Sequence, residues 1–218
     1  LSTPSEVCAG DPSYITFIFT RGASPWTINY NNNGFPVSLG PWSDTTTVTQ
    51  ILTSTTNYDF TRVTDDKGCY TDLFDNFDIV VNPLPIAELT VDNRFICSNN
   101  KDSKATLIFD VETVEEDGLG NTIYPLREYK VFYKVDLDNT QIPDSLYGNP
   151  AHKEIETNVR GNYSIIRVVD NKGCEAIEKG EMVTIVVNPT PTAKLMVSPQ
   201  YTDINNPVIR FGNKSSGH

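Results

Sequence analysis

One stretch of the sequence decides the fold: residues 57–69 read Asn57-Tyr58-Asp59-Phe60-Thr61-Arg62-Val63-Thr64-Asp65-Asp66-Lys67-Gly68-Cys69. It recurs without gaps at residues 162–174 as Asn-Tyr-Ser-Ile-Ile-Arg-Val-Val-Asp-Asn-Lys-Gly-Cys, with eight of the thirteen positions identical. A second match follows, in which Ile79-Val80-Val81-Asn82-Pro83 corresponds to Ile185-Val186-Val187-Asn188-Pro189. Two matches in the same order indicate two copies of one module.

Each copy is predicted to consist of short strands separated by turns. Apolar and polar residues alternate over Trp26–Tyr30 and again over Tyr129–Val135, which gives each strand one apolar face. Asn33-Gly34 predicts a tight hairpin turn. The alternation breaks at Arg62-Val63 and at Arg167-Val168, which predicts a β-bulge in both copies before a tight Asp-x-Lys-Gly turn. No helical period competes, so we expect an all-β chain of tandem immunoglobulin-like β-sandwich modules.

Two proline-rich stretches predict the module boundaries. Residues 82–85 (Asn-Pro-Leu-Pro) and 188–191 (Asn-Pro-Thr-Pro) follow the last strand of each copy, and proline stiffens the chain there. We therefore predict one module at 1–86 and a second at 87–191, joined end to end. Residues 192–218 are predicted to begin a third, incomplete module, because 193–197 and 207–211 look like two strands that need more partners.

Four cysteines bear on the cellular compartment: Cys8, Cys69, Cys97 and Cys174. They form no Cys-x-x-Cys pair, and the chain has only two histidines, so a zinc cluster lacks ligands. Four cysteines allow three pairings, and the repeat favours one disulfide per module, Cys8–Cys69 and Cys97–Cys174. This pairing predicts an oxidising, extracytoplasmic setting. The alternative is four unbonded thiols in a cytosolic protein.

The charge excludes some classes of partner. The chain has 17 Lys and Arg against 28 Asp and Glu, a net charge of −11, so nucleic acid and anionic lipid would be repelled. No apolar run approaches the roughly 18 residues that a membrane-spanning helix needs. We expect a chain that does not span a membrane and does not bind nucleic acid.

The repeated motifs also resemble a known group of proteins. Val63–Cys69, Val168–Cys174 and the two Val-Val-Asn-Pro-x-Pro endings are similar to the tandem immunoglobulin-like and PKD-like repeats of large Bacteroidota cell-surface adhesins. These include gliding-motility adhesins exported by the type IX secretion system. The resemblance covers residues 1 to about 191, and Val208–Gly217 is similar to the early strand of a PKD domain, although the Trp-x-Phe-Gly-Asp-Gly motif of that domain is absent. It implies an extracellular stalk attached to the outer membrane, with cell-envelope or outer-membrane proteins of the type IX and gliding apparatus as partners.

The sequence contains few residues in patterns typical of a catalytic or metal-binding site. His152 is the only histidine away from the terminus, it is predicted in a loop, and no Gly-x-Ser-x-Gly is present, so we predict that the chain is not an enzyme. Residues 136–147 lack the glycine and glutamate of an EF-hand loop. No cofactor is expected. Structural calcium could still bind at an irregular site in one of two acidic groups, Asp65, Asp66 and Asp170 or Glu115, Glu116 and Asp117. The alternative is that these acids lie in turns and are simply solvated.

Two function hypotheses remain. The first is a non-catalytic stalk and interaction region of a secreted cell-surface adhesin. The second is a set of accessory immunoglobulin-like modules of a secreted hydrolase, which bind surface glycans through exposed aromatic residues. The candidates for such contacts are Trp26, Trp42 and Tyr147.

The second copy carries an insertion that could serve as a contact surface. Most of its extra residues lie in Glu112–Pro125, before the central strand. Glu115, Glu116 and Asp117 are predicted to form a flexible acidic loop, and Ile123 and Tyr124 an apolar anchor for a partner. A tolerated insertion without any partner is an equal alternative, because long loops cost little stability.

Overall fold

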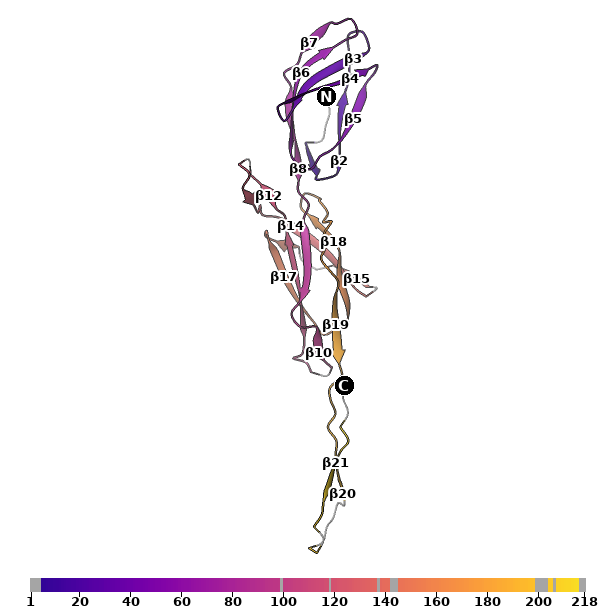
Figure 1. Cartoon of the computed structure of the whole chain (residues 1–218), viewed down its shortest axis with the longest axis vertical. Helices are drawn as coiled ribbons and strands as arrows, with labels where there is room; N and C mark the ends of the chain where they lie inside the picture. Colours follow the sequence, from indigo (N-terminus) through magenta and orange to yellow (C-terminus); the bar gives the residue numbers. More distant parts are fainter. Residues whose placement is uncertain are drawn as a thin grey trace.

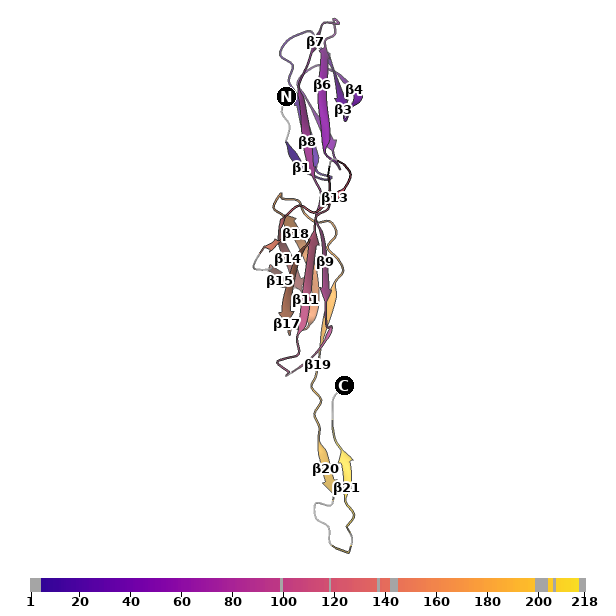
Figure 2. The same cartoon turned by 90° about the vertical axis from the view of Figure 1, so that its left-hand side faces the viewer.

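The chain forms two β-sandwich modules stacked end to end, with a two-stranded hairpin beyond the second (Figure 1). The computed structural model describes residues 5–98, 100–117, 119–136, 138–141, 145–198, 204–205 and 207–215. Within these ranges every regular element is a strand, as the sequence predicts. The arrangement is equally slender after a quarter turn (Figure 2), so the described chain is a rod. We call β1–β8 (residues 6–82) module 1 and β9–β19 (residues 86–188) module 2.

Module 1 consists of two facing sheets. The larger has the strand order β1-β8-β6-β3-β4, with β7 beside β6, and the smaller pairs β2 with β5. The first strand β1 runs parallel to β8, and the other pairings are antiparallel. The strands are β1 (Glu6–Cys8), β2 (Pro12–Phe17), β3 (Trp26–Asn32), β4 (Phe35–Trp42), β5 (Thr46–Ile51), β6 (Thr56–Thr64), β7 (Tyr70–Asp72) and β8 (Asn76–Asn82).

Module 2 repeats this plan and adds a strand to the smaller sheet. Its larger sheet has the order β10-β19-β18-β14-β15, with β16 beside β14, and its smaller sheet has the order β17-β11-β9. Strand β10 runs parallel to β19, and the other pairings are antiparallel. Two facing, mainly antiparallel sheets with this strand order are an immunoglobulin-like sandwich. The strands are β9 (Ile86–Val91), β10 (Phe95–Cys97), β11 (Ala105–Glu112), β14 (Glu128–Val135), β15 (Asp138–Gln141), β16 (Leu146–Tyr147), β17 (Ala151–Thr157), β18 (Gly161–Asp170) and β19 (Val183–Asn188).

The predicted turn and bulges are present. Asn33 and Gly34 have φ angles of 47° and 82°, which is the left-handed pair that a tight hairpin turn between β3 and β4 requires. The register of β3 against β6 shifts by one residue next to Arg62, and that of β14 against β18 shifts in the same way next to Arg167. Both bulges let an apolar residue return to the core face after the break in alternation.

Each module has its own hydrophobic core. In module 1, Tyr30, Tyr58 and Phe60 pack together, with 5.3 Å between the ring centroids of Tyr30 and Phe60. In module 2, Phe109 and Tyr133 form a similar contact at 5.2 Å. The two clusters of buried residues share no member. Burial of each large side chain contributes about 1.5–3 kcal/mol, so each module carries its own source of stability.

Two further hairpins lie outside the sandwiches. The insertion of module 2 folds into β12 (Glu115–Glu116) and β13 (Thr122–Ile123), and β20 (Leu195–Ser198) pairs with β21 (Arg210–Asn213). The second pair matches the two strands predicted after residue 191, and all of its residues are exposed. A search of the described residues for a helix long and apolar enough to cross a membrane finds none.

Candidate functional site at the module junction

A tight turn places a cysteine on the end of module 2 that faces module 1. The Asp170 carboxylate accepts hydrogen bonds from the backbone N–H groups of Lys172 and Cys174, at 2.9 and 2.8 Å. Gly173 has a φ of 86°, a conformation that side chains disfavour, so glycine suits this position. The repeated Asp-x-Lys-Gly-Cys motif thus holds Cys174 at the tip of the turn after β18.

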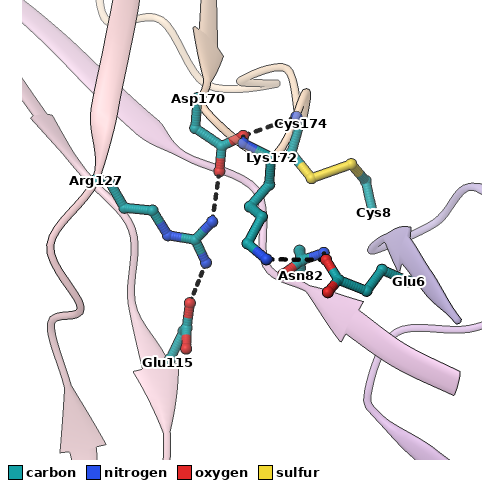
Figure 3. The surroundings of a disulfide bond; sticks show 8 residues. All are labelled: Glu6, Cys8, Asn82, Glu115, Arg127, Asp170, Lys172 and Cys174. Atoms are coloured by element: carbon teal, nitrogen blue, oxygen red, sulfur yellow. Dashed lines mark hydrogen bonds and ion pairs between the residues drawn. A yellow bond between two sulfur atoms is a disulfide. The ribbon is translucent and has the colours of Figure 1, made fainter. Parts of the chain in front are cut away.

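A disulfide crosses the junction between the modules. Cys8, the last residue of β1 in module 1, is bonded to Cys174 in module 2, with a Cα–Cα distance of 5.5 Å and a sequence separation of 166 residues (Figure 3). Cys69 and Cys97 are free and exposed. The predicted pairing of Cys8 with Cys69 and of Cys97 with Cys174 is therefore wrong.

The topology explains this correction. Strand β1 of module 1 runs parallel to β8, and β10 of module 2 runs parallel to β19. Cys8 and Cys97 therefore lie beside Asn82 and Asn188, where the chain leaves each module. Cys69 follows β6 and Cys174 follows β18, and in each module the chain then runs back through the last strand, β8 or β19. These two turn cysteines therefore lie at the opposite end of the module from Asn82 and Asn188. Two cysteines at opposite ends of one sandwich cannot meet, because a disulfide holds its Cα atoms within about 7 Å. The cysteines of successive modules can meet at a junction.

Polar contacts accompany the disulfide. Lys172 Nζ lies 2.9 Å from Glu6 Oε2, and the Asn82 side-chain amide donates to the same oxygen at 3.4 Å (Figure 3). The hydrogen bond from Lys172, followed by that from Asn82, lowers the pKa of the Glu6 carboxyl. Both side chains of the ion pair are more than a third exposed, so the pair adds little energy to the junction.

A buried cluster of charges supports the turn from below. Arg127 is 5% exposed, and its Nη1 donates to the fully buried Asp170 carboxylate at 3.1 Å. Its Nη2 forms an ion pair with Glu115 on β12. In module 1 the backbone N–H of Ala23 donates to the equivalent Asp65 carboxylate at 3.1 Å, and this bond is the main cause of the lowered pKa of Asp65. Arg127 therefore ties the junction turn to the base of the inserted hairpin, and no sequence pattern pointed to it.

Part of the insertion is a two-stranded hairpin, because Glu115 and Glu116, predicted in a loop, form β12 and pair with β13. The Asp117 carboxylate accepts hydrogen bonds from the backbone N–H groups of Leu119 and Asn121, both at 2.8 Å, and from the Asn121 side chain. The Asn121 side chain is the main cause of the lowered pKa of Asp117. The hairpin stands beside the junction (Figure 1). Glu115 is committed to Arg127, which leaves Glu116, Ile123 and Tyr124 as exposed predicted contact residues.

The residues considered for metal binding and catalysis do not form such a site in the described part of the chain. Among the described residues, no group of three or more His, Cys, Asp or Glu side chains is arranged to hold a metal ion. His152 lies on strand β17 and not in a loop, with its Nδ1 2.7 Å from Asp110 and its Nε2 3.4 Å from Glu154. In a catalytic triad one ring nitrogen of the histidine faces a carboxylate and the other faces a nucleophile. Both ring nitrogens of His152 face carboxylates, so this arrangement is not that of a triad.

Two of the three candidate aromatic residues pack within module 1. The Trp26 ring stacks on Phe19 with centroids 4.8 Å apart, and Trp42 stacks on Phe17 at 5.5 Å. Tyr147 in module 2 is 72% exposed. A flat glycan-binding platform of several aromatic rings is therefore not formed by these three residues.

Comparisons with known proteins give distant structural matches. No protein-family model and no curated protein sequence matches the chain. A chain of a 1.5-MDa bacterial ice-binding adhesin, from a structure concerned with host cell surface retention, is similar at 13% identity and a TM-score of 0.41. That match covers 89% of this chain and 66% of that chain, so this chain spans just under two thirds of its length. The fibronectin(III)-like modules of CbhA from Clostridium thermocellum match at 15% identity and a TM-score of 0.34, over 85% of this chain and 90% of that chain.

Proposed function

We propose that this chain is a non-catalytic stalk segment of a large secreted cell-surface adhesin. The observation that carries the proposal is the disulfide between Cys8 and Cys174, which joins two modules end to end. The two modules have separate hydrophobic cores, and the bond joins the end of one module to the end of the other, so it acts on the relation between them. A covalent clamp across a junction suits a spacer that must project another part of the protein and resist bending and pulling.

The chemistry of the chain fits an extracellular setting. A disulfide persists in oxidising compartments and is rare in the cytosol. The net charge of −11 keeps an exposed rod soluble and separate from anionic surfaces. These features support a location outside the cell.

The finer assignment rests on the repeated motifs. Val63–Cys69, Val168–Cys174 and the Asn-Pro-x-Pro endings resemble repeats of Bacteroidota adhesins. We therefore propose that the parent protein is a gliding-type adhesin exported by the type IX secretion system. In this proposal the stalk is attached to the outer membrane, and cell-envelope proteins of the secretion and gliding apparatus are its partners. The exposed face of the inserted hairpin, with Glu116, Ile123 and Tyr124, is the proposed contact with such a partner.

A replacement experiment tests the stalk. In cells that display the parent protein, residues 5–191 are deleted or replaced by an unrelated rod of two β-sandwich modules of equal length. We expect deletion to reduce adhesion and the unrelated rod to restore it, because a spacer acts through its length. If the unrelated rod is displayed at the normal level but adhesion stays low, the modules bind a ligand themselves and the spacer role is wrong.

A further inference from the structure

The two free cysteines lie at the outer ends of the two modules. Cys69 immediately precedes β7, at the end of module 1 remote from the junction, and Cys97 ends β10, at the end of module 2 remote from the junction (Figure 1). Both are exposed. Each free cysteine can be compared with the cysteine at the equivalent position of the other module, which is bonded in both cases.

Cys97 occupies the position of the bonded Cys8. Strand β1 pairs with β8 in parallel so that Cys8 lies opposite Asn82, and β10 pairs with β19 in parallel so that Cys97 lies opposite Asn188. The residue after each cysteine continues the match, because Ala9 N–H donates to the Asn82 carbonyl at 2.9 Å and Ser98 N–H to the Asn188 carbonyl at 2.7 Å. The backbone thus presents the two cysteines in the same way at the exit of each module.

Cys69 occupies the position of the bonded Cys174. The N–H of Cys69 donates to the Asp65 carboxylate at 2.9 Å, and that of Cys174 donates to the Asp170 carboxylate at 2.8 Å. The return bonds, from the N–H of each aspartate to the carbonyl of its cysteine, measure 2.9 and 3.0 Å. The turns differ in one respect: Cys174 is fully buried and bonded to Cys8 of the neighbouring module, whereas Cys69 is exposed and free.

We propose that Cys69 and Cys97 are the two open halves of further disulfides between modules. Cys97 bonds to the turn cysteine of a following module, and Cys69 bonds to the cysteine of a preceding module that is equivalent to Cys8 and Cys97. Every junction of the stalk then repeats the Cys8–Cys174 bond. This inference rests on the proposed stalk, in which like modules flank this segment. Residues 189–218 contain no cysteine, so the partner of Cys97 comes from outside the 218 residues.

The neighbouring side chains indicate what each partner should carry. Lys67, the equivalent of Lys172, has a side chain 73% exposed, and a preceding module would offer it an acid two residues before its cysteine, as Glu6 does. At the other end Phe95 stands in the place of Glu6 and is 63% exposed. A lysine of the following module can lie over this ring, since cations are attracted to aromatic faces.

Bond formation needs an oxidant, which we take to be a disulfide compound. The Cys97 thiolate attacks the oxidant and forms a mixed disulfide, and one thiol leaves. The partner cysteine's thiolate then attacks the Cys97 sulfur and expels the second thiol. Two protein thiols are oxidised to one disulfide, the oxidant is reduced to two thiols, and the two protein protons pass to those leaving thiolates.

The test uses a chain with three modules, made of residues 1–191 followed by a second copy of residues 86–218 in which Cys97 is changed to serine, so that a single Cys97 remains. This design repeats the proline junction, and in a buffer of reduced and oxidised glutathione we expect Cys97 to bond to Cys174 of the added copy. Peptide mapping without reduction should recover this linkage in most molecules, beside Cys8–Cys174. Cys97→Ser should abolish it, and Cys69→Ser, the matched control, should leave it unchanged. Recovery of Cys97 as an alkylated thiol beside an intact Cys8–Cys174 bond would overturn the proposal.

A second measurement does not depend on how the added copy folds. In the parent protein taken from the cell surface, Cys69 and Cys97 should each be linked to a peptide of a flanking module. Recovery of both as free thiols would contradict the proposal. Linkage maps report the bonds and the replacement experiment reports adhesion, so either proposal can fail without the other.

Discussion

At the scale of single residues, Arg127 is the side chain on which the junction turn depends. It is almost fully buried and pairs with the fully buried Asp170. Removal of one partner of a buried ion pair leaves the other charge without compensation, which costs about 3–5 kcal/mol. We expect Arg127→Ala to lower the free energy of unfolding of module 2 by about that amount in a denaturant titration.

Arg167 provides the matched control for this prediction. It forms an ion pair with Glu175 at 2.8 Å in the same module, but both side chains are about half exposed. Exposed pairs contribute about 0.2–1 kcal/mol, so Arg167→Ala should have a small effect. Equal losses for the two variants would show that Arg127 has no special role.

His152 gives module 2 a pH dependence of its own. Hydrogen bonds to Asp110 and then to Glu154 raise the pKa of the His152 imidazole above its usual value. A raised pKa in the folded state adds stability that is complete below about pH 6.5 and is lost as the pH rises through the raised pKa. We expect the difference in unfolding free energy between the native chain and His152→Gln to shrink from pH 6 to pH 9. A difference that grows with pH would contradict this assignment.

Residue identity alone could not predict the cysteine pairing. The repeat shows which cysteines are equivalent, but it does not show at which end of a sandwich each one lies. That information comes from the parallel pairing of β1 with β8, which places Cys8 beside Asn82 at the exit of module 1. Arg127 was also missed, since a single arginine before a strand carries no pattern that distinguishes it from a surface residue.

At the scale of elements, the inserted hairpin has a structural base and a separable tip. Thr113 is fully buried, and its hydroxyl accepts a hydrogen bond from the Tyr129 hydroxyl at 2.9 Å. Glu115 pairs with Arg127, whereas Glu116 faces Thr122 across the hairpin. A deletion that includes Thr113 or Glu115 would therefore damage module 2.

The tip can be removed without this damage. Glu116 and Thr122 face each other across the hairpin, so residues 117–121 can be replaced by Asn-Gly, which favours a tight two-residue turn. Combined with Ile123→Ser and Tyr124→Ser, which remove the exposed apolar contact residues, this replacement should leave the unfolding free energy of module 2 within about 0.5 kcal/mol. Recovery of cell-envelope partners in a pull-down should fall. Unchanged recovery of every partner would show that the hairpin tip is not a contact surface.

The strands were the most predictable part of the molecule. Alternation over Trp26–Tyr30 and Tyr129–Val135 identified β3 and β14, and the paired breaks in alternation identified both bulges. The insertion was located correctly, but its pairing as β12 and β13 was not foreseen, because two-residue strands are too short to show a period. His152 was predicted in a loop, although β17 begins at Ala151.

At the scale of the whole molecule, the disulfide links the stabilities of the two modules. When module 1 unfolds alone, its chain stays fixed at Cys8 and at the start of β9, which closes a long loop in the unfolded state. In the chain-entropy model such a loop contributes about 4 kcal/mol. We expect Cys8→Ser to destabilise module 1 by up to about this amount in a denaturant titration, with module 2 unfolding separately.

Cys69→Ser is the control for this prediction, since Cys69 is exposed and unbonded. It should change the stability of module 1 by less than about 0.5 kcal/mol. If Cys69→Ser destabilises module 1 as strongly as Cys8→Ser, the two cysteines act together and the bond across the junction is absent.

The central claim, that a disulfide clamps the two modules end to end, is tested most directly by peptide mapping of the oxidised chain. Free thiols are alkylated, the unreduced chain is digested, and the linked peptides are identified by mass spectrometry. The structure predicts one linked pair, Cys8 with Cys174, together with alkylated Cys69 and Cys97. Linkage of Cys8 to Cys69 and of Cys97 to Cys174 would contradict it and would leave the junction without a covalent clamp.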